Sequence, residues 1–125
     1  DIKPGNILIH SDGTVKLSDF GIFHQFPSNT DNDNDASCNE IIGTTIYMSR
    51  ERLCGKKYSY LSDIWSIGLC VAQSIYPNFP LFINYDESST LIQKYILSTT
   101  KFIYEFFPDE IVMDDIIKDF MKMCL

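Results

Sequence analysis

The chain of 125 residues has few cysteines, no excess of basic residues and no long apolar run. Its four cysteines (Cys38, Cys54, Cys70 and Cys124) show neither CxxC nor Cys/His spacing, which argues against a zinc site or disulfide framework and favours reduced thiols in the cytoplasm. The net charge of −7 argues against nucleic acid as a partner, because phosphate backbones recruit basic patches. No segment is apolar for long enough to cross a bilayer and no signal peptide is visible, so we expect no membrane partner.

Two short apolar segments near the start of the chain predict a β-hairpin. Ile7–His10 is followed by the turn signal SDG and by the alternating segment TVKLSDF. Because a hairpin brings its outer ends together, we expect Asp1, Asn6 and Asp19 to converge at one mouth, with Lys3 beside them. Carboxylate and amide oxygens suit Mg²⁺, and phosphoryl transfer needs a metal-bound phosphate, a neutralising cation and an oriented hydroxyl. The four side chains together indicate a phosphoryl-transfer site.

A polar loop precedes a long apolar helix. Residues 27–40 are rich in Asn and Asp and lack apolar periodicity, so we expect this segment to be disordered. The segment Ser62–Tyr76 carries apolar residues on nearly every side, which predicts a buried helix. Ser62 is placed to cap its start, and Pro77 ends it.

Two further helices are expected towards the end of the chain. The first covers Ser88–Thr100, with one apolar face. The second is marked by a helical apolar stripe of Met113, Ile116, Ile117, Phe120, Met121 and Cys124. On the opposite side of this helix, Asp114 is expected to pair with Lys118 at the i, i+4 spacing.

The motifs DIKPGN, SDFG, GTTIYMSRE and SDIWSIG occur in this order, and with this series the chain resembles the large lobe of eukaryotic protein kinases. The resemblance covers residues 1–125, and the wording of the last two motifs is most similar to the MAP kinase kinase branch. It implies an α+β fold, namely a mainly helical large lobe with a short β-hairpin, in which 19–51 is the activation segment. It also implies ATP and Mg²⁺ as cofactors.

The resemblance assigns roles to five residues at the hairpin mouth. Asp1 matches the catalytic-loop Asp that orients the substrate hydroxyl, and Lys3 matches the Lys that contacts the transferred phosphate. Asn6 and Asp19 match the two residues that hold Mg²⁺, and Leu8 matches the apolar residue beneath the adenine ring. An ordinary strand-core role for Leu8 is compatible with this assignment.

Five other residues match supporting positions of the family. Phe20 is expected to pack inward, and Gly21 gives the backbone freedom to rearrange. Thr44 matches the threonine that hydrogen-bonds the catalytic Asp and Lys. Glu51 would pair with a later Arg, and Asp63 would hold the catalytic-loop backbone.

The activation segment also holds the regulatory candidates. Glu40 occupies the position where MAP kinase kinases carry an activating Ser, so its carboxylate is a candidate phosphate mimic, with plain solvated loop charge as the alternative. Ser37 is a candidate for phosphorylation, with Ser28 and Thr30 as weaker ones. Arg50 stands where the family usually has Pro, and we interpret this as a tolerated substitution. The alternatives are a loosened loop and an Arg that binds a phosphate.

The sequence leaves two main functions open. The first is a protein kinase that in its complete form phosphorylates Ser or Thr, or also Tyr, of a protein such as a downstream kinase, under an upstream activating kinase. The second is a pseudokinase or docking module, because the sequence contains no small lobe and starts within its catalytic loop. For the same reason we expect the isolated chain to be inactive. A small-molecule phosphotransferase is disfavoured by GTTIYMSRE, which resembles a protein-substrate platform.

Overall fold

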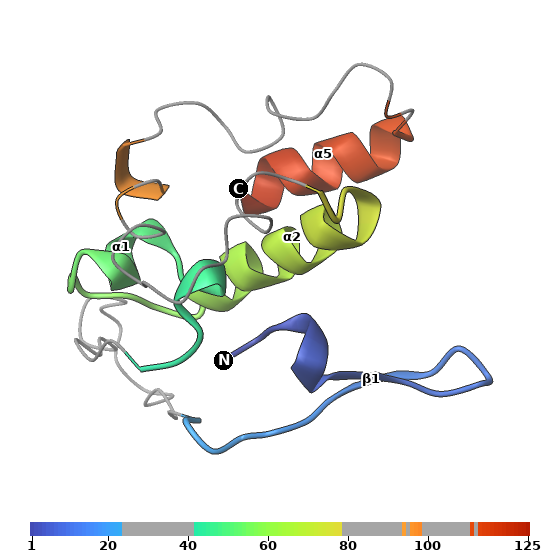
Figure 1. The fold of residues 1–125 in the computed structure, drawn as a ribbon, viewed down its shortest axis with the longest axis horizontal. Helices are drawn as coiled ribbons and strands as arrows, with labels where there is room; N and C mark the ends of the chain where they lie inside the picture. Colours follow the sequence, from blue (N-terminus) through green and yellow to red (C-terminus); the bar gives the residue numbers. More distant parts are fainter. Residues whose placement is uncertain (24–41, 79–93, 95, 99–110, 112) are drawn as a thin grey trace, which may run out of the picture.

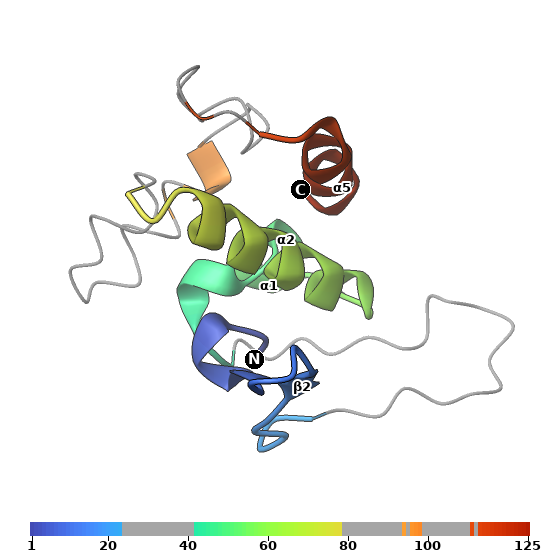
Figure 2. The ribbon, with the colours of Figure 1, turned by 90° about the vertical axis from the view of Figure 1, so that its right-hand side faces the viewer.

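The computed structural model describes residues 1–23, 42–78, 94, 96–98, 111 and 113–125. Its elements are η1 (Pro4–Asn6), β1 (Ile7–Ile9), β2 (Val15–Leu17), η2 (Thr45–Tyr47), α1 (Arg50–Leu53), α2 (Leu61–Ile75) and α5 (Asp115–Cys124). Helix α2 lies between α5 on one side and the hairpin with the N-terminus on the other (Figures 1 and 2). Helices and a small antiparallel sheet therefore occur together, as expected for a kinase fragment. The predicted disorder of 27–40 and most of the predicted helix Ser88–Thr100 lie outside the described residues.

The predicted hairpin is confirmed. Strands β1 and β2 pair antiparallel, with Ile7 opposite Leu17. Beyond this pair, the backbone N–H and the hydroxyl of Ser18 donate to the carbonyl oxygen of Asn6 at 2.8 and 3.1 Å. The outer ends of the hairpin are therefore fastened together beside Asp19, which brings the two ends of the candidate site into one place.

Helix α2 begins one residue earlier than predicted, and its start is not capped by Ser62. Tyr60 is the N-cap residue, without a side-chain cap, whereas the Ser62 side chain is 2% exposed and its hydroxyl donates to Glu51. The helix is also not buried all round, because Ile64 is 40% exposed. Its buried face carries mostly small residues, namely Ser62, Ser66, Gly68, Leu69, Cys70 and Ala72. Small side chains let neighbouring segments approach the helix closely, so this face of α2 is the one against which they pack.

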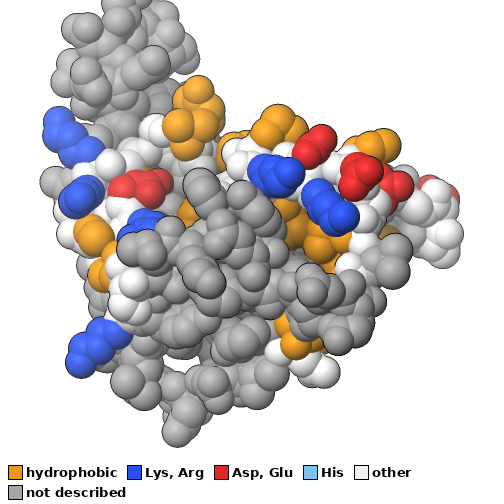
Figure 3. Space-filling model, turned by 90° about the horizontal axis from the view of Figure 1, so that it is seen from above, with side chains coloured by type: hydrophobic (Ala, Val, Ile, Leu, Met, Phe, Trp, Pro, Cys, Tyr) orange, Lys and Arg blue, Asp and Glu red, His pale blue; other side chains and the backbone are white. Residues whose placement is uncertain are grey.

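The helix predicted at the apolar stripe is confirmed as α5, but its ion pair differs from the one expected. The Asp114 carboxylate accepts from the backbone N–H of Ile116 at 2.8 Å and caps the helix. Because Asp114 is used as a cap, Lys118 instead lies 3.5 Å from the Asp115 carboxylate. Met121 is fully buried, whereas Ile116 is 79% exposed, so only part of the stripe faces the core. Seen from above, acidic and basic side chains alternate with exposed apolar ones (Figure 3).

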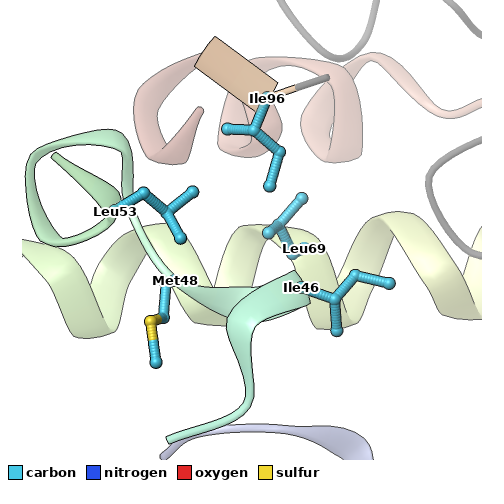
Figure 4. Close-up of a cluster of buried hydrophobic side chains, with 5 residues drawn as sticks. All are labelled: Ile46, Met48, Leu53, Leu69 and Ile96. Atoms are coloured by element: carbon cyan, nitrogen blue, oxygen red, sulfur yellow. The ribbon is translucent and has the colours of Figure 1, made fainter. Parts of the chain in front are cut away.

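One core cluster holds the segment that reaches the candidate site. It consists of Ile46, Met48, Leu53, Leu69 and Ile96, each at most 4% exposed (Figure 4). A second cluster of Ala72, Met113 and Met121 joins α2 to α5. Burying each large apolar side chain contributes about 1.5–3 kcal/mol, so the first cluster anchors η2 and α1 firmly on α2. Within the described residues, no helix has both the length and the apolar character that a bilayer crossing requires.

The described cysteines are free thiols in contrasting environments, which predicts a difference in reactivity. Burial raises the pKa of Cys70 to about 11, whereas Cys54 is exposed. At pH 8 only about one Cys70 side chain in a thousand is then a thiolate, the reactive form. Iodoacetamide is expected to label Cys54 within minutes and to leave Cys70 unmodified, as read by peptide mass spectrometry. Both should be labelled in denaturant, and equal labelling in the folded protein would contradict this arrangement.

Candidate active site

Asp1 and Lys3, at the start of the chain, form a hydrogen-bonded triangle with the distant residue Thr44. The Lys3 ammonium donates to Asp1 Oδ2 at 2.6 Å and to Thr44 Oγ1 at 3.0 Å. The backbone N–H of Thr44 donates to Asp1 Oδ1 at 2.8 Å. Both oxygens of the Asp1 carboxylate are therefore fixed, and the half-buried ion pair keeps Lys3 beside it. Thr44 thus makes hydrogen bonds to Asp1 and Lys3, as the family resemblance implied.

The loop that carries Asp1 is closed by Asn6. Pro4 starts the short helix η1, where its fixed backbone angle and missing N–H are tolerated. Asn6 is 8% exposed, and its amide nitrogen donates to the backbone carbonyl of Asp1 at 2.9 Å. Because the amide nitrogen is engaged in the loop, the amide oxygen is the end of Asn6 that is available to a ligand.

Gly43 lets the Thr44 segment approach the loop that carries Asp1. Its φ is +120°, a conformation that side chains rarely allow. A Cβ atom at this position would lie 3.3 Å from Asp1 Oδ1 and 3.3 Å from Ile22 Cδ1. The close contact between Thr44 and Asp1 therefore depends on a residue without a side chain.

Asp19 ends the hairpin in a strained turn. Its φ is +60°, which Asp tolerates better than most residues, and its Oδ1 accepts from the backbone N–H of Gly21 at 3.2 Å. The prediction that Phe20 packs inward is wrong, because this side chain is 67% exposed. Phe20 lies in a turn closed by the Phe23 N–H, at the rim of a cavity and outside both core clusters.

Asp1, Asn6 and Asp19 line one cavity of about 520 Å³, as their expected convergence requires. Leu8 does not join them. It lies on the other face of the hairpin opposite Lys16, is 55% exposed and lines a separate hollow of about 370 Å³. The oxygen-bearing side chains and Leu8, which the family resemblance places beneath the adenine ring, therefore line different hollows.

The residues of the first cavity fit a hard cation that keeps part of its water shell. Within the described part of the chain, no group of three or more His, Cys, Asp or Glu side chains could hold a metal ion on its own. Asn6 and Asp19 nevertheless offer one amide oxygen and one carboxylate. This set suits Mg²⁺, which usually binds one or two protein oxygens together with water and phosphate.

A buried polar network supports the segment after Thr44. The Ser62 hydroxyl donates to Glu51 Oε1 at 2.9 Å and lies 2.9 Å from the Ser49 hydroxyl. The partner of Glu51 in the described residues is therefore a serine, which the sequence did not indicate. Asp63 is exposed and lines the cavity, but among the described residues no backbone N–H of the loop at 1–6 donates to its carboxylate.

Two arginines of α1, Arg50 and Arg52, make contacts that the sequence motifs do not predict. Arg50, in place of the usual Pro, donates to the Leu97 carbonyl at 3.2 Å and so connects α1 to residues 96–98. Arg52 is 8% exposed and lines the cavity of Asp1. The sequence gives no signal for Arg52 beyond its place directly after Glu51. The regulatory candidates Ser28, Thr30, Ser37 and Glu40 lie outside the described residues.

Comparisons with known proteins agree with the family resemblance of the sequence motifs. The model of the protein kinase domain family matches residues 1–125. The chain is 42% identical over 81 residues to the dual specificity mitogen-activated protein kinase kinase dSOR1 of Drosophila melanogaster. This match covers 65% of the chain but only 19% of that relative.

Proposed function

Because the chain belongs to the protein kinase family, we propose that it is part of an enzyme that transfers the γ-phosphate of ATP to Ser or Thr of a protein. The observation that carries the proposal is the triangle of Asp1, Lys3 and Thr44 at the edge of the cavity that Asn6 and Asp19 line. The similarity to dSOR1 supports an enzyme of the MAP kinase kinase type, with dual specificity.

In this proposal each residue of the triangle has a separate task. Asp1 accepts a hydrogen bond from the substrate hydroxyl and takes its proton as the oxygen attacks phosphorus. Lys3 neutralises charge that develops on the transferred phosphate, and Thr44 holds both side chains in register. Asn6 and Asp19 would hold Mg²⁺, which neutralises the phosphates of ATP when bound.

Partners and regulation are proposed from the same resemblance. The name of dSOR1 describes a kinase that acts on another kinase, and this supports a downstream kinase as the protein substrate. An upstream kinase would act on the activation segment, at Ser37 first, while Glu40 supplies a fixed negative charge. We also propose a cytoplasmic location.

The test is a transfer assay with the full-length protein, radiolabelled ATP and a general protein substrate. We expect label on Ser or Thr, lost when EDTA removes Mg²⁺. Asp19→Asn removes a metal-binding carboxylate and should raise the Mg²⁺ concentration for half-maximal rate by at least about tenfold. Asp12→Asn is the matched control, since Asp12 is an exposed carboxylate at the far turn of the same hairpin. Absence of transfer by the wild-type protein, or equal Mg²⁺ dependence of both variants, would refute the proposal.

A further inference from the structure

Arg52 is a buried cation whose contacts lead to the candidate active site. Its Nη2 donates to the backbone carbonyl of Ile42 at 2.6 Å, a short charge-assisted hydrogen bond. Its guanidinium lies 4.7 Å from the centre of the Tyr58 ring, which stabilises the charge from the other side. Among the described residues no carboxylate pairs with Arg52, and its Nε is buried without a partner. Burying a charged side chain is costly, and the Ile42 carbonyl and the Tyr58 ring are the groups that stabilise the Arg52 charge within the described residues.

The carbonyl that Arg52 holds belongs to the segment that makes the catalytic triangle. Ile42 is followed by Gly43, with φ of +120°, and then by Thr44, which contacts both Asp1 and Lys3. Fixing the Ile42 carbonyl fixes the orientation of the following peptide plane, because the peptide bond is rigid. Gly43 alone would leave this segment free to adopt other conformations. Arg52 therefore restricts the flexible joint through which Thr44 reaches the catalytic loop.

We propose that Arg52 is a positioning residue that sets the place of Thr44, and through it the geometry of Asp1 and Lys3. The inference rests on the proposed kinase function. Arg52 itself makes no hydrogen bond to Asp1 or Lys3 among the described contacts, so it acts through the backbone of 42–44. The planar guanidinium can stack on Tyr58 and donate to Ile42 at once, which a lysine ammonium cannot reproduce fully.

The test compares Arg52→Met and Arg52→Lys with Leu53→Ala in the full-length protein. Arg52→Met removes the charge-assisted bond and should lower kcat about 10- to 100-fold, with the KM for ATP unchanged. Arg52→Lys keeps the charge and one donor and should recover part of this loss. Leu53 is a core residue of the same helix, 2% exposed, so Leu53→Ala should lower the melting temperature and leave the kcat of the folded protein unchanged.

A second measurement separates this inference from the proposed function. Hydrogen exchange of Gly43 and Thr44, which precede η2, should become at least about tenfold faster in Arg52→Met and remain slow in Leu53→Ala. If Arg52→Met does not fold, Tyr58→Leu should accelerate the same exchange by at least about twofold, since it removes the ring contact and leaves Arg52 in place. Unchanged hydrogen exchange in Arg52→Met would overturn the role of Arg52. So would a loss of kcat that is the same in the Arg52 and Leu53 variants for the same drop in melting temperature. An inactive wild-type protein with the expected exchange pattern would support the role of Arg52 and refute the kinase function instead.

Discussion

Asp1→Asn is expected to lower the kcat of phosphate transfer about 10²- to 10⁴-fold in the full-length protein, with the KM for ATP nearly unchanged. Asparagine keeps an oxygen that can accept from the backbone N–H of Thr44, now at 2.8 Å from Asp1. It lacks the negative charge that holds Lys3 at 2.6 Å and the basicity that takes the hydroxyl proton. ATP binding should persist, because in the proposal Asn6 and Asp19 hold the metal ion.

Steady-state kinetics with varied ATP and saturating protein substrate measure this effect. Asp115→Asn is the matched control, since its carboxylate is 94% exposed on α5 and far from the triangle in the fold. We expect its kcat to stay within about twofold of wild type, as for most surface substitutions. A kcat for Asp1→Asn within tenfold of wild type would show that another group activates the hydroxyl.

The parts of the fold that the sequence predicted depend on local patterns. The hairpin follows from alternation across a Gly-containing turn, and α5 follows from the helical spacing of its apolar residues. The two errors have different causes: the one at Ser62 comes from a contact between separate helices, and the one at Lys118 comes from a local cap. Ser62 has the chemistry of a cap, but its hydroxyl donates to Glu51 and also lies 2.9 Å from the Ser49 hydroxyl, and these contacts depend on how α1 packs on α2. Lys118 fails to meet Asp114 because the carboxylate caps the helix instead.

For the candidate site too, local patterns predict some positions, and contacts between distant residues decide the others. Hairpin geometry alone predicts that Asp1, Asn6 and Asp19 converge, because the strands fasten the ends together. Thr44 lies 43 positions from Asp1, so only the family resemblance could place it there. Arg52 was not predicted, since nothing local shows that its side chain turns inward to the Ile42 carbonyl. Phe20 was misplaced because its exposure depends on a turn that the motif does not specify.

Gly68→Ala is expected to destabilise the fold by about 1–3 kcal/mol, although alanine is the better helix former. Gly68 lies in α2 where α5 packs against it. An added Cβ atom would stand 2.7 Å from the Cys124 Cβ and 2.9 Å from two Leu125 side-chain carbons, closer than real atoms approach. The two helices must therefore separate or tilt, which also loosens the cluster around Met121.

Chemical denaturation of the full-length protein measures the loss, and hydrogen exchange of peptides from α2 and α5 locates it. Ser74→Ala is the control on the exposed side of the same helix and should change stability by at most about 0.5 kcal/mol. In a Cys124→Gly background the 2.7 Å contact is gone, so Gly68→Ala should cost less there than in the wild type. Equal costs in both backgrounds would mean that the contact with Cys124 is not what requires glycine at position 68, and would leave the two Leu125 carbons as the atoms that an added Cβ meets.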